Sequence, residues 1–176
     1  MAIQATADQG FIRKHNTAVV LDSLRRFAPL SRAELAARTG LNRSTVSLIV
    51  YILIKEGFIQ EAYLQSPKIG RPGMLLVLNP RGGFAVGVEI GVEFILVILT
   101  DFVANVLWRW RQLSDLIEDQ SPDLSRAFKI TQQAIEAGLQ KGLRPLGIGV
   151  EVLGLVDTAQ GRLIAAVMVM LGKSAI

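Results

Sequence analysis

The sequence predicts a protein of the α+β or α/β class, with a winged helix-turn-helix at its N-terminus and a mixed region behind it. Three observations lead to this prediction. Residues 31–47 follow the pattern of two short helices joined by a tight turn. Residues 58–78 have the pattern of two strands around a loop rich in glycine and proline, and a new succession of strands and a helix begins at residue 84. The order helix, helix, helix, strand, loop, strand is that of a winged helix.

Three helices are expected in the first region. The first is predicted over residues 15–27, where apolar residues recur near helical spacing. The second follows Ser31, a good N-cap, and Glu34 three residues on completes a capping box. The third is predicted over residues 42–56, with Asn42 as its N-cap. Their apolar faces, together with the second strand, predict a small core: Leu24, Leu35, Val46, Ile49, Leu53 and Leu76.

The second region is expected to begin near residue 81, so the predicted domains are residues 13–80 and residues 81–176. Its first three strands are joined by short connections, which favour antiparallel neighbours. Ser121 and Pro122 then have the pattern of a helix start. The predicted elements are strands over 84–91, 94–101 and 103–111, a helix over 121–141, and strands over 146–153 and 162–169.

Composition excludes several kinds of chemistry. Of the 176 residues, 51% are hydrophobic, so the chain is expected to bury a core. Cysteine is absent and His15 is the only histidine, which excludes disulfides, thiolate metal sites and most zinc and triad chemistry. We therefore assign no catalytic residue, cofactor or metal, and we expect a protein that is not an enzyme. No apolar run reaches membrane length and no signal pattern is present, so we expect a cytoplasmic protein without a membrane partner.

The net charge of +4 is unevenly spread. Residues 1–80 contain ten Lys and Arg against five acids, whereas residues 81–176 contain nine against ten. The basic excess therefore coincides with the helix-turn-helix pattern, as neutralising DNA phosphates requires. Ordinary scatter of charge along a chain is the alternative explanation.

The start of the third helix carries the main candidate site. Its small polar and basic residues are types that read base edges or contact phosphates, and we expect Arg43, Ser44 and Ser47 to point outward. These residue types also favour helix starts, which is the structural alternative. The predicted DNA-binding residues, with those of the loop described next, are Arg32, Asn42, Arg43, Ser44, Thr45, Ser47, Lys68 and Arg71.

The loop between the two strands is the second candidate. Residues 66–72 form the predicted wing, and the tripeptide Gly70-Arg71-Pro72 gives it a narrow tip. Arg71 suits the negative potential of a DNA minor groove, and Lys68 suits a phosphate. An ordinary hairpin turn with a solvated arginine is the alternative.

Several segments together resemble the ROK (repressor, open reading frame, kinase) family of transcriptional regulators. The resemblance covers most of residues 14–172. The family implies a winged helix followed by an actin/ribonuclease H-like, sugar-kinase-like lobe. Its repressors bind double-stranded operator DNA as symmetric homo-oligomers and release it on binding a sugar or sugar phosphate. The matching segments are Ser31–Ala36, Thr39–Ser47, Gly57-Phe58, Gly70–Pro72, Leu78–Pro80, Gly87–Gly91, Leu99–Asp101, Gly147–Val150 and Gly154–Asp157.

One departure from this family lies on the third helix, where Leu48 and Tyr51 stand at positions that are often polar or charged in relatives. The other departures concern the second region. Its kinase-like domain is much longer than residues 81–176, and its catalytic aspartate, its sugar-contacting residues and its Cys/His zinc cluster lie further along. At the position of the kinases' phosphate loop, Asp-x-Gly-Gly-Thr, this chain has Glu89-Ile90-Gly91-Val92-Glu93. A carboxylate there disfavours a nucleotide phosphate. We therefore expect a truncated member or a fragment, whose partial lobe is too short to sense a sugar as its relatives do.

The sequence leaves three candidate functions for the chain. The leading one is a sequence-specific DNA-binding regulator, a repressor by resemblance, with residues 42–56 in the major groove and residues 66–72 at the minor groove. The second is a winged helix used for protein contacts with an inert remnant attached. The third is a sugar kinase, for which the residues of phosphoryl transfer are absent or altered.

Overall fold

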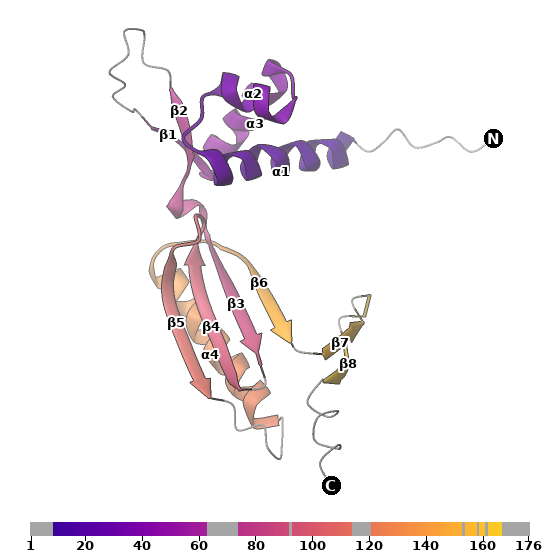
Figure 1. Ribbon diagram of the computed structural model, residues 1–176. Coiled ribbons are helices and arrows are strands. Elements are labelled where there is room, and N and C mark those ends of the chain that lie inside the picture. Colours follow the sequence, from indigo (N-terminus) through magenta and orange to yellow (C-terminus); the bar gives the residue numbers. More distant parts are fainter. Residues whose placement is uncertain are drawn as a thin grey trace, which may run out of the picture. The chain divides into compact units, whose positions relative to one another are not determined.

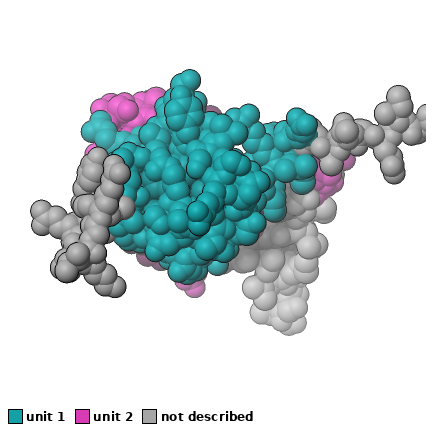
Figure 2. All heavy atoms as spheres, turned by 90° about the horizontal axis from the view of Figure 1, so that it is seen from above, with its two compact units in different colours: residues 1–82 teal, residues 83–176 magenta. Residues whose placement is uncertain are grey.

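The computed structural model describes the backbone of residues 9–62, 74–91, 93–113, 121–152, 154–157, 159–160 and 162–166. The chain divides into two compact units, residues 1–82 and residues 83–176 (Figure 1 and Figure 2). Each unit has its own hydrophobic core, which is the physical mark of a domain.

Three helices and a pair of strands make up the first unit. The helices are α1 (Gln9–Phe27), α2 (Arg32–Thr39) and α3 (Arg43–Lys55). Strands β1 (Ile59–Ala62) and β2 (Leu75–Leu78) pair antiparallel, and a 3-10 turn over Pro80–Gly82 follows. This order is the predicted one.

Helix α1 begins at Gln9, well before the predicted start at residue 15. The prediction followed apolar spacing, which becomes regular only from Val19. The earlier turns are exposed, and glutamine, arginine and lysine supply good helix propensity there. Propensity and backbone hydrogen bonds, rather than burial, therefore extend the helix.

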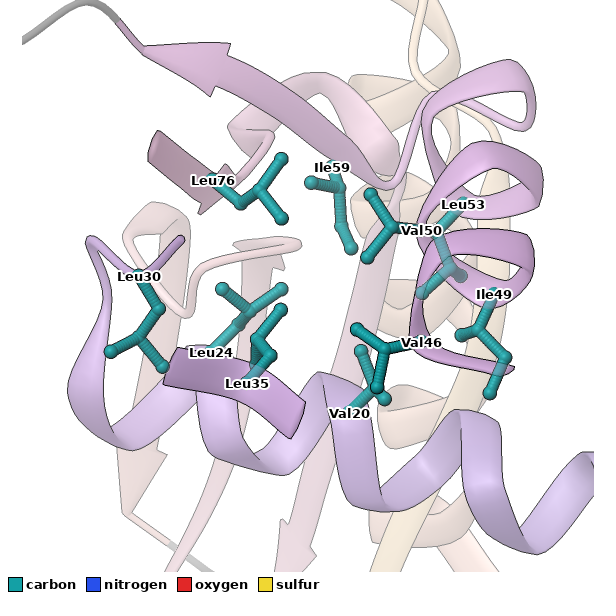
Figure 3. Packing of buried hydrophobic residues seen from close by; sticks show 10 residues of the cluster. All are labelled: Val20, Leu24, Leu30, Leu35, Val46, Ile49, Val50, Leu53, Ile59 and Leu76. Carbon is teal, nitrogen blue, oxygen red and sulfur yellow. The ribbon is translucent and has the colours of Figure 1, made fainter. Parts of the chain in front are cut away.

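The core of the first unit lies between the three helices and the strand pair (Figure 3). All six residues predicted for it are at most 4% exposed. The structure adds one residue from each of α1, the α1–α2 connection, α3 and β1, in that order: Val20, Leu30, Val50 and Ile59. Apolar side chains from every element of the unit thus meet in one cluster.

Leu30 has a second role that the sequence did not indicate. Its backbone N–H donates to the Leu76 carbonyl at 3.2 Å, and its carbonyl accepts from the Leu76 N–H at 2.8 Å. This bridge adds a third, very short strand position beside β2. It ties the connection after α1 to the strand pair, so the hairpin and the helices form one body.

The predicted capping box is present at the start of α2. The Ser31 hydroxyl accepts from the Glu34 backbone N–H at 3.2 Å, and a Glu34 carboxylate oxygen accepts from the Ser31 N–H at 2.7 Å. The Ser31 hydroxyl also donates to that oxygen at 2.8 Å. The backbone bond first, and then the hydroxyl bond, hold the pKa of Glu34 below its ordinary value of 4.5.

Replacing Ser31 with alanine is expected to destabilise the first unit by about 1 kcal/mol at neutral pH, because α2 loses its N-cap. Folding lowers the pKa of Glu34, so its stabilising contribution is present above pH 4.5 and is lost as the pH falls through the lower, folded value. Urea unfolding at neutral and acidic pH measures both effects. Ser47→Ala, at an exposed site without a capping role, is the matched control. An equal loss at both pH values would contradict the role of the carboxylate.

The second unit is a four-stranded sheet with one long helix. The first three strands are β3 (Phe84–Ile90), β4 (Phe94–Asp101) and β5 (Val106–Leu113). Each pairs antiparallel with the next along the chain, as predicted. Helix α4 (Ser121–Gln140) then connects to β6 (Pro145–Val152), which lies parallel beside β3. The sheet order is β5-β4-β3-β6, and β7 (Gly154–Asp157) pairs with β8 (Arg162–Ala166) as a separate antiparallel hairpin.

The predicted start of β5 at residue 103 is wrong. The Asp101 carboxylate accepts hydrogen bonds from the backbone N–H groups of Val103 and Asn105, both at 2.9 Å. Ala104 has a φ of 68°, which suits a turn and not a strand. The chain therefore turns around Asp101, and the strand begins at Val106.

Helix α4 packs on one face of this sheet (Figure 1). At Gly138 the helix lies so close to the sheet that a Cβ atom would come within 2.8 Å of the Phe84 ring. Glycine is therefore required where the helix meets this fully buried aromatic side chain. Alternate residues of β3 and β4 complete the core: Val86, Val88, Ile95, Val97 and Leu99.

Strand β6 is not covered in the same way. Leu146, Ile148 and Val150 are 43%, 51% and 62% exposed, although they share a face with the buried residues of β3. This edge strand thus leaves a row of apolar side chains exposed. The predicted strand over 162–169 is described only as far as Ala166.

Candidate nucleic-acid interface

The turn between α2 and α3 depends on Gly40. Its φ is +69°, a left-handed conformation that favours glycine, and its N–H donates to the Ala36 carbonyl at 3.1 Å. This conformation ends α2 and turns the chain toward the N-cap of α3. Two residues on lies Asn42, and α3 begins directly after it at Arg43.

Asn42 is the N-cap of α3. Its side-chain oxygen accepts from the Thr45 backbone N–H at 2.7 Å and from the Ser44 hydroxyl at 2.8 Å. The side-chain oxygen therefore fixes the helix start, while the amide nitrogen keeps its donors. Sequence reasoning foresaw this capping role, and the role in DNA binding stays a prediction.

The outer face of α3 is exposed along its length. Arg43, Ser44 and Ser47 are exposed, in the outward orientation that the sequence predicted. The predicted DNA-binding set did not include Leu48 and Tyr51, which are 57% and 63% exposed. They continue the spacing that begins at Ser44 and Ser47, so all four residues share one face of the helix. Two large side chains therefore lie among the residues that are predicted to contact DNA.

Thr45 differs from its neighbours because it is half-buried and faces a groove between α3 and α1. The groove has a volume of about 260 Å³. Its walls come from the third helix and from the first half of the first helix: Thr45, Leu48, Ile49, Gln9, Ile12, Arg13 and Asn16. Sequence reasoning missed the α1 side of this groove because it expected no helix before residue 15.

Arg32 is held by a partner on another element. Its guanidinium lies 3.0 Å from a carboxylate oxygen of Glu61 on β1, and both side chains are partly buried. The pair ties the start of α2 to the strand pair. Arg32 therefore has a structural contact in this unit, and a contact with DNA stays a prediction.

Lys68 and Arg71, with the rest of the predicted wing over residues 66–72, lie outside the described residues. The described ends of β1 and β2 flank that segment, and their register pairs Ala62 with Leu75. The wing therefore remains a prediction.

Three described acids of the first unit, Asp22, Glu34 and Glu61, are bonded to groups outside α3. Asp22 pairs with Arg25 at 2.8 Å and with Arg26 at 2.7 Å, and their hydrogen bonds lower the pKa of its carboxyl. Helix α3 itself contains no acid. Within the described ranges, none of the recorded ion pairs involves Arg43. The outer face of α3 is thus basic and polar, with two apolar side chains.

Three helices, a capped turn and an antiparallel strand pair define the first unit as a winged helix-turn-helix. A family model described as the IclR helix-turn-helix domain matches residues 16–62. This range contains α2, the turn and α3.

Longer similarities extend through both units. The chain is 37% identical over 157 residues to the xylose repressor of Bacillus subtilis (strain 168), covering 88% of this chain and 40% of the relative. It is 34% identical over 161 residues to a putative xylose repressor of Caldicellulosiruptor sp. (strain Rt8B.4), covering 90% and 40%. The DNA-binding transcriptional dual regulator NagC of Escherichia coli (strain K12) is 29% identical over 164 residues, with 86% and 37% covered.

A solved structure supports the same fold. The crystal structure of a ROK family transcriptional regulator, a homologue of the E. coli MLC protein, matches with a TM-score of 0.67 and 22% identity, covering 89% of this chain and 39% of that one. The fold is therefore that of a ROK family transcriptional regulator, and the sequence is similar to those of xylose repressors. The chain spans about 40% of the length of the curated relatives it matches.

Two further findings bear on function. In the described part of the chain, no cluster of three or more His, Cys, Asp or Glu side chains is arranged to hold a metal ion. None of the helices described here combines the length and apolar character that a bilayer crossing needs.

Proposed function

We propose that this chain is a sequence-specific DNA-binding transcriptional regulator that acts as a repressor. The observation that carries the proposal is the outer face of α3, which is exposed, free of acids and headed by Arg43. In this proposal residues 13–80 are the DNA-binding domain, and residues 42–56 enter the major groove.

The dimensions support this docking. An α-helix with its side chains is about 10–12 Å across, and the major groove of DNA is about 12 Å wide. Arg43 lies in the first turn of α3, and the N-terminal residues of a recognition helix are those that meet base edges. Its planar guanidinium can donate two hydrogen bonds to one guanine, and the hydroxyls of Ser44 and Ser47 can bond to bases or phosphates.

The relatives extend the proposal to its biological setting. Two of them are called xylose repressor or putative xylose repressor, and the third a DNA-binding transcriptional dual regulator. We propose double-stranded operator DNA of carbohydrate genes as the partner, bound by a homo-oligomer, with residues 66–72 at the minor groove. A sugar effector is proposed for the longer relatives, whose additional length this chain does not span.

Catalysis is not part of the proposal. Glu93 lies exposed at the turn between β3 and β4, where the resemblance places a phosphate loop in the kinases. A carboxylate at this turn repels the phosphates of a nucleotide.

Binding selection from a random duplex pool, followed by fluorescence anisotropy with the selected and a scrambled duplex, tests the proposal. We expect enrichment of a defined sequence, preference for the selected duplex, and affinity that falls steeply as salt rises. Enrichment of no sequence, with no DNA retained even at low salt, would contradict it. The exposed Leu48 and Tyr51 would then favour the alternative function, a winged helix that docks on another protein.

A further inference from the structure

We propose that the first half of α1 is a second DNA-contacting surface, in which the groove between α1 and α3 receives the sugar-phosphate backbone of one DNA strand and Arg13 binds a phosphate. This inference rests on the proposed function of α3. It adds the kind of contact, the side of the recognition helix on which it occurs, and the residue responsible.

The groove has one continuous wall on α1. Gln9, Ile12, Arg13 and Asn16 follow the spacing i, i+3, i+4, i+7, so they share one face of the helix, and all four line the groove. The opposite wall includes Leu48, which belongs to the proposed DNA-reading face of α3. The groove therefore adjoins the surface that would enter the major groove.

The geometry of DNA places a strand at this position. A helix inside the major groove has a sugar-phosphate backbone on each side of it, because the groove is only about 12 Å wide. Packed helices lie about 8–10 Å apart, axis to axis. A helix packed beside α3 at this distance therefore lies next to the phosphates of the DNA strand that borders the groove on that side.

The lining suits both components of a DNA backbone. Ile12 and Leu48, which are 47% and 57% exposed, supply apolar area for the faces of the deoxyribose rings. Arg13, with a guanidinium, and Gln9, with an amide, supply hydrogen-bond donors for phosphate oxygens. A groove with apolar and cationic parts thus matches an alternation of sugars and phosphates.

The charge of Arg13 is available for such a contact. Among the described residues, none of the recorded ion pairs involves Arg13, and the first turn of α1 contains no acid. The acid of the same helix, Asp22, lies more than two turns further on and is held by Arg25 and Arg26. A polyanion is accordingly the partner that this face complements.

The test compares Arg13→Ala with Lys14→Ala in the whole chain, using the selected and the scrambled duplex at several salt concentrations. Lys14 is the matched control, because it is the next residue of α1, is also exposed, carries the same charge and does not line the groove. We expect Arg13→Ala to weaken both duplexes alike, by about tenfold at about 50 mM salt. The plot of log affinity against log salt concentration should also become less steep, by about one released ion per protein copy bound. The ratio of wild-type to variant affinity should therefore shrink about 3.5-fold between about 50 and 200 mM salt.

Lys14→Ala should leave the salt dependence of binding unchanged, and Arg13→Lys should restore it because the charge is kept. Equal effects of Arg13→Ala and Lys14→Ala would overturn the inference, since the charge would then act from a distance and not in the groove. The inference would also be overturned if Arg13→Ala bound DNA as tightly as the wild-type chain while Arg43→Ala bound it more weakly. The proposed function would then remain intact. Failure of the wild-type chain to bind any duplex would remove both.

Discussion

Replacing Leu35 with alanine is expected to destabilise the first unit by about 2–5 kcal/mol, because a fully buried leucine leaves a cavity. Leu35 lies on α2 in the cluster formed by all three helices and the strand pair (Figure 3). Since domains are stable by only about 5–15 kcal/mol, this loss is a large part of the total. Chemical unfolding followed by circular dichroism measures it, and DNA binding at physiological temperature should weaken with it.

Leu48→Ala is the matched control for this experiment. It makes the same chemical change on α3, but the Leu48 side chain is 57% exposed, so stability should change by no more than about 0.5 kcal/mol. If Leu35→Ala were as mild as Leu48→Ala, the first unit would not depend on the core that joins α2 to α1 and α3.

Replacing Arg43 with alanine is expected to narrow the difference in affinity between the selected and scrambled duplexes by about 1–3 kcal/mol, the value of a good bidentate contact with a base. Arg43 is the first residue of α3, it is exposed, and it projects beside a helix start fixed by Asn42. Its loss should reduce preference at one base position more than it reduces overall binding. A repeated binding selection with the variant measures this directly.

Two variants separate the contact from the charge. Arg43→Lys keeps the charge but loses the planar pair of donors, so it should retain binding to the scrambled duplex and lose preference. Lys55→Ala removes a charge from the other end of α3 and should leave base preference unchanged. Unchanged preference in both Arg43 variants would show that Arg43 does not read a base.

The candidate site was predictable where it depends on neighbours in the chain. Asn42 caps α3, and Ser44 and Ser47 face outward, because a cap and a helical face are set by residues within four positions of each other. The α1 side of the groove, with Arg13, was missed because the first turns of α1 carry no regular apolar pattern. The salt bridge of Arg32 with Glu61 was missed because its partners are far apart in sequence.

The sequence by itself therefore determined where most helices and turns lie and which helical faces are buried, since capping bonds, glycine conformations and periodicity are local. The start of β5 was misplaced even so, because the hydrogen bonds of Asp101 reshaped the turn. Only the tertiary structure decided the bridge between Leu30 and Leu76, the parallel pairing of β6 with β3, and the groove between α1 and α3. These features join segments distant in the chain, and their register depends on how apolar faces pack together, which no local pattern specifies.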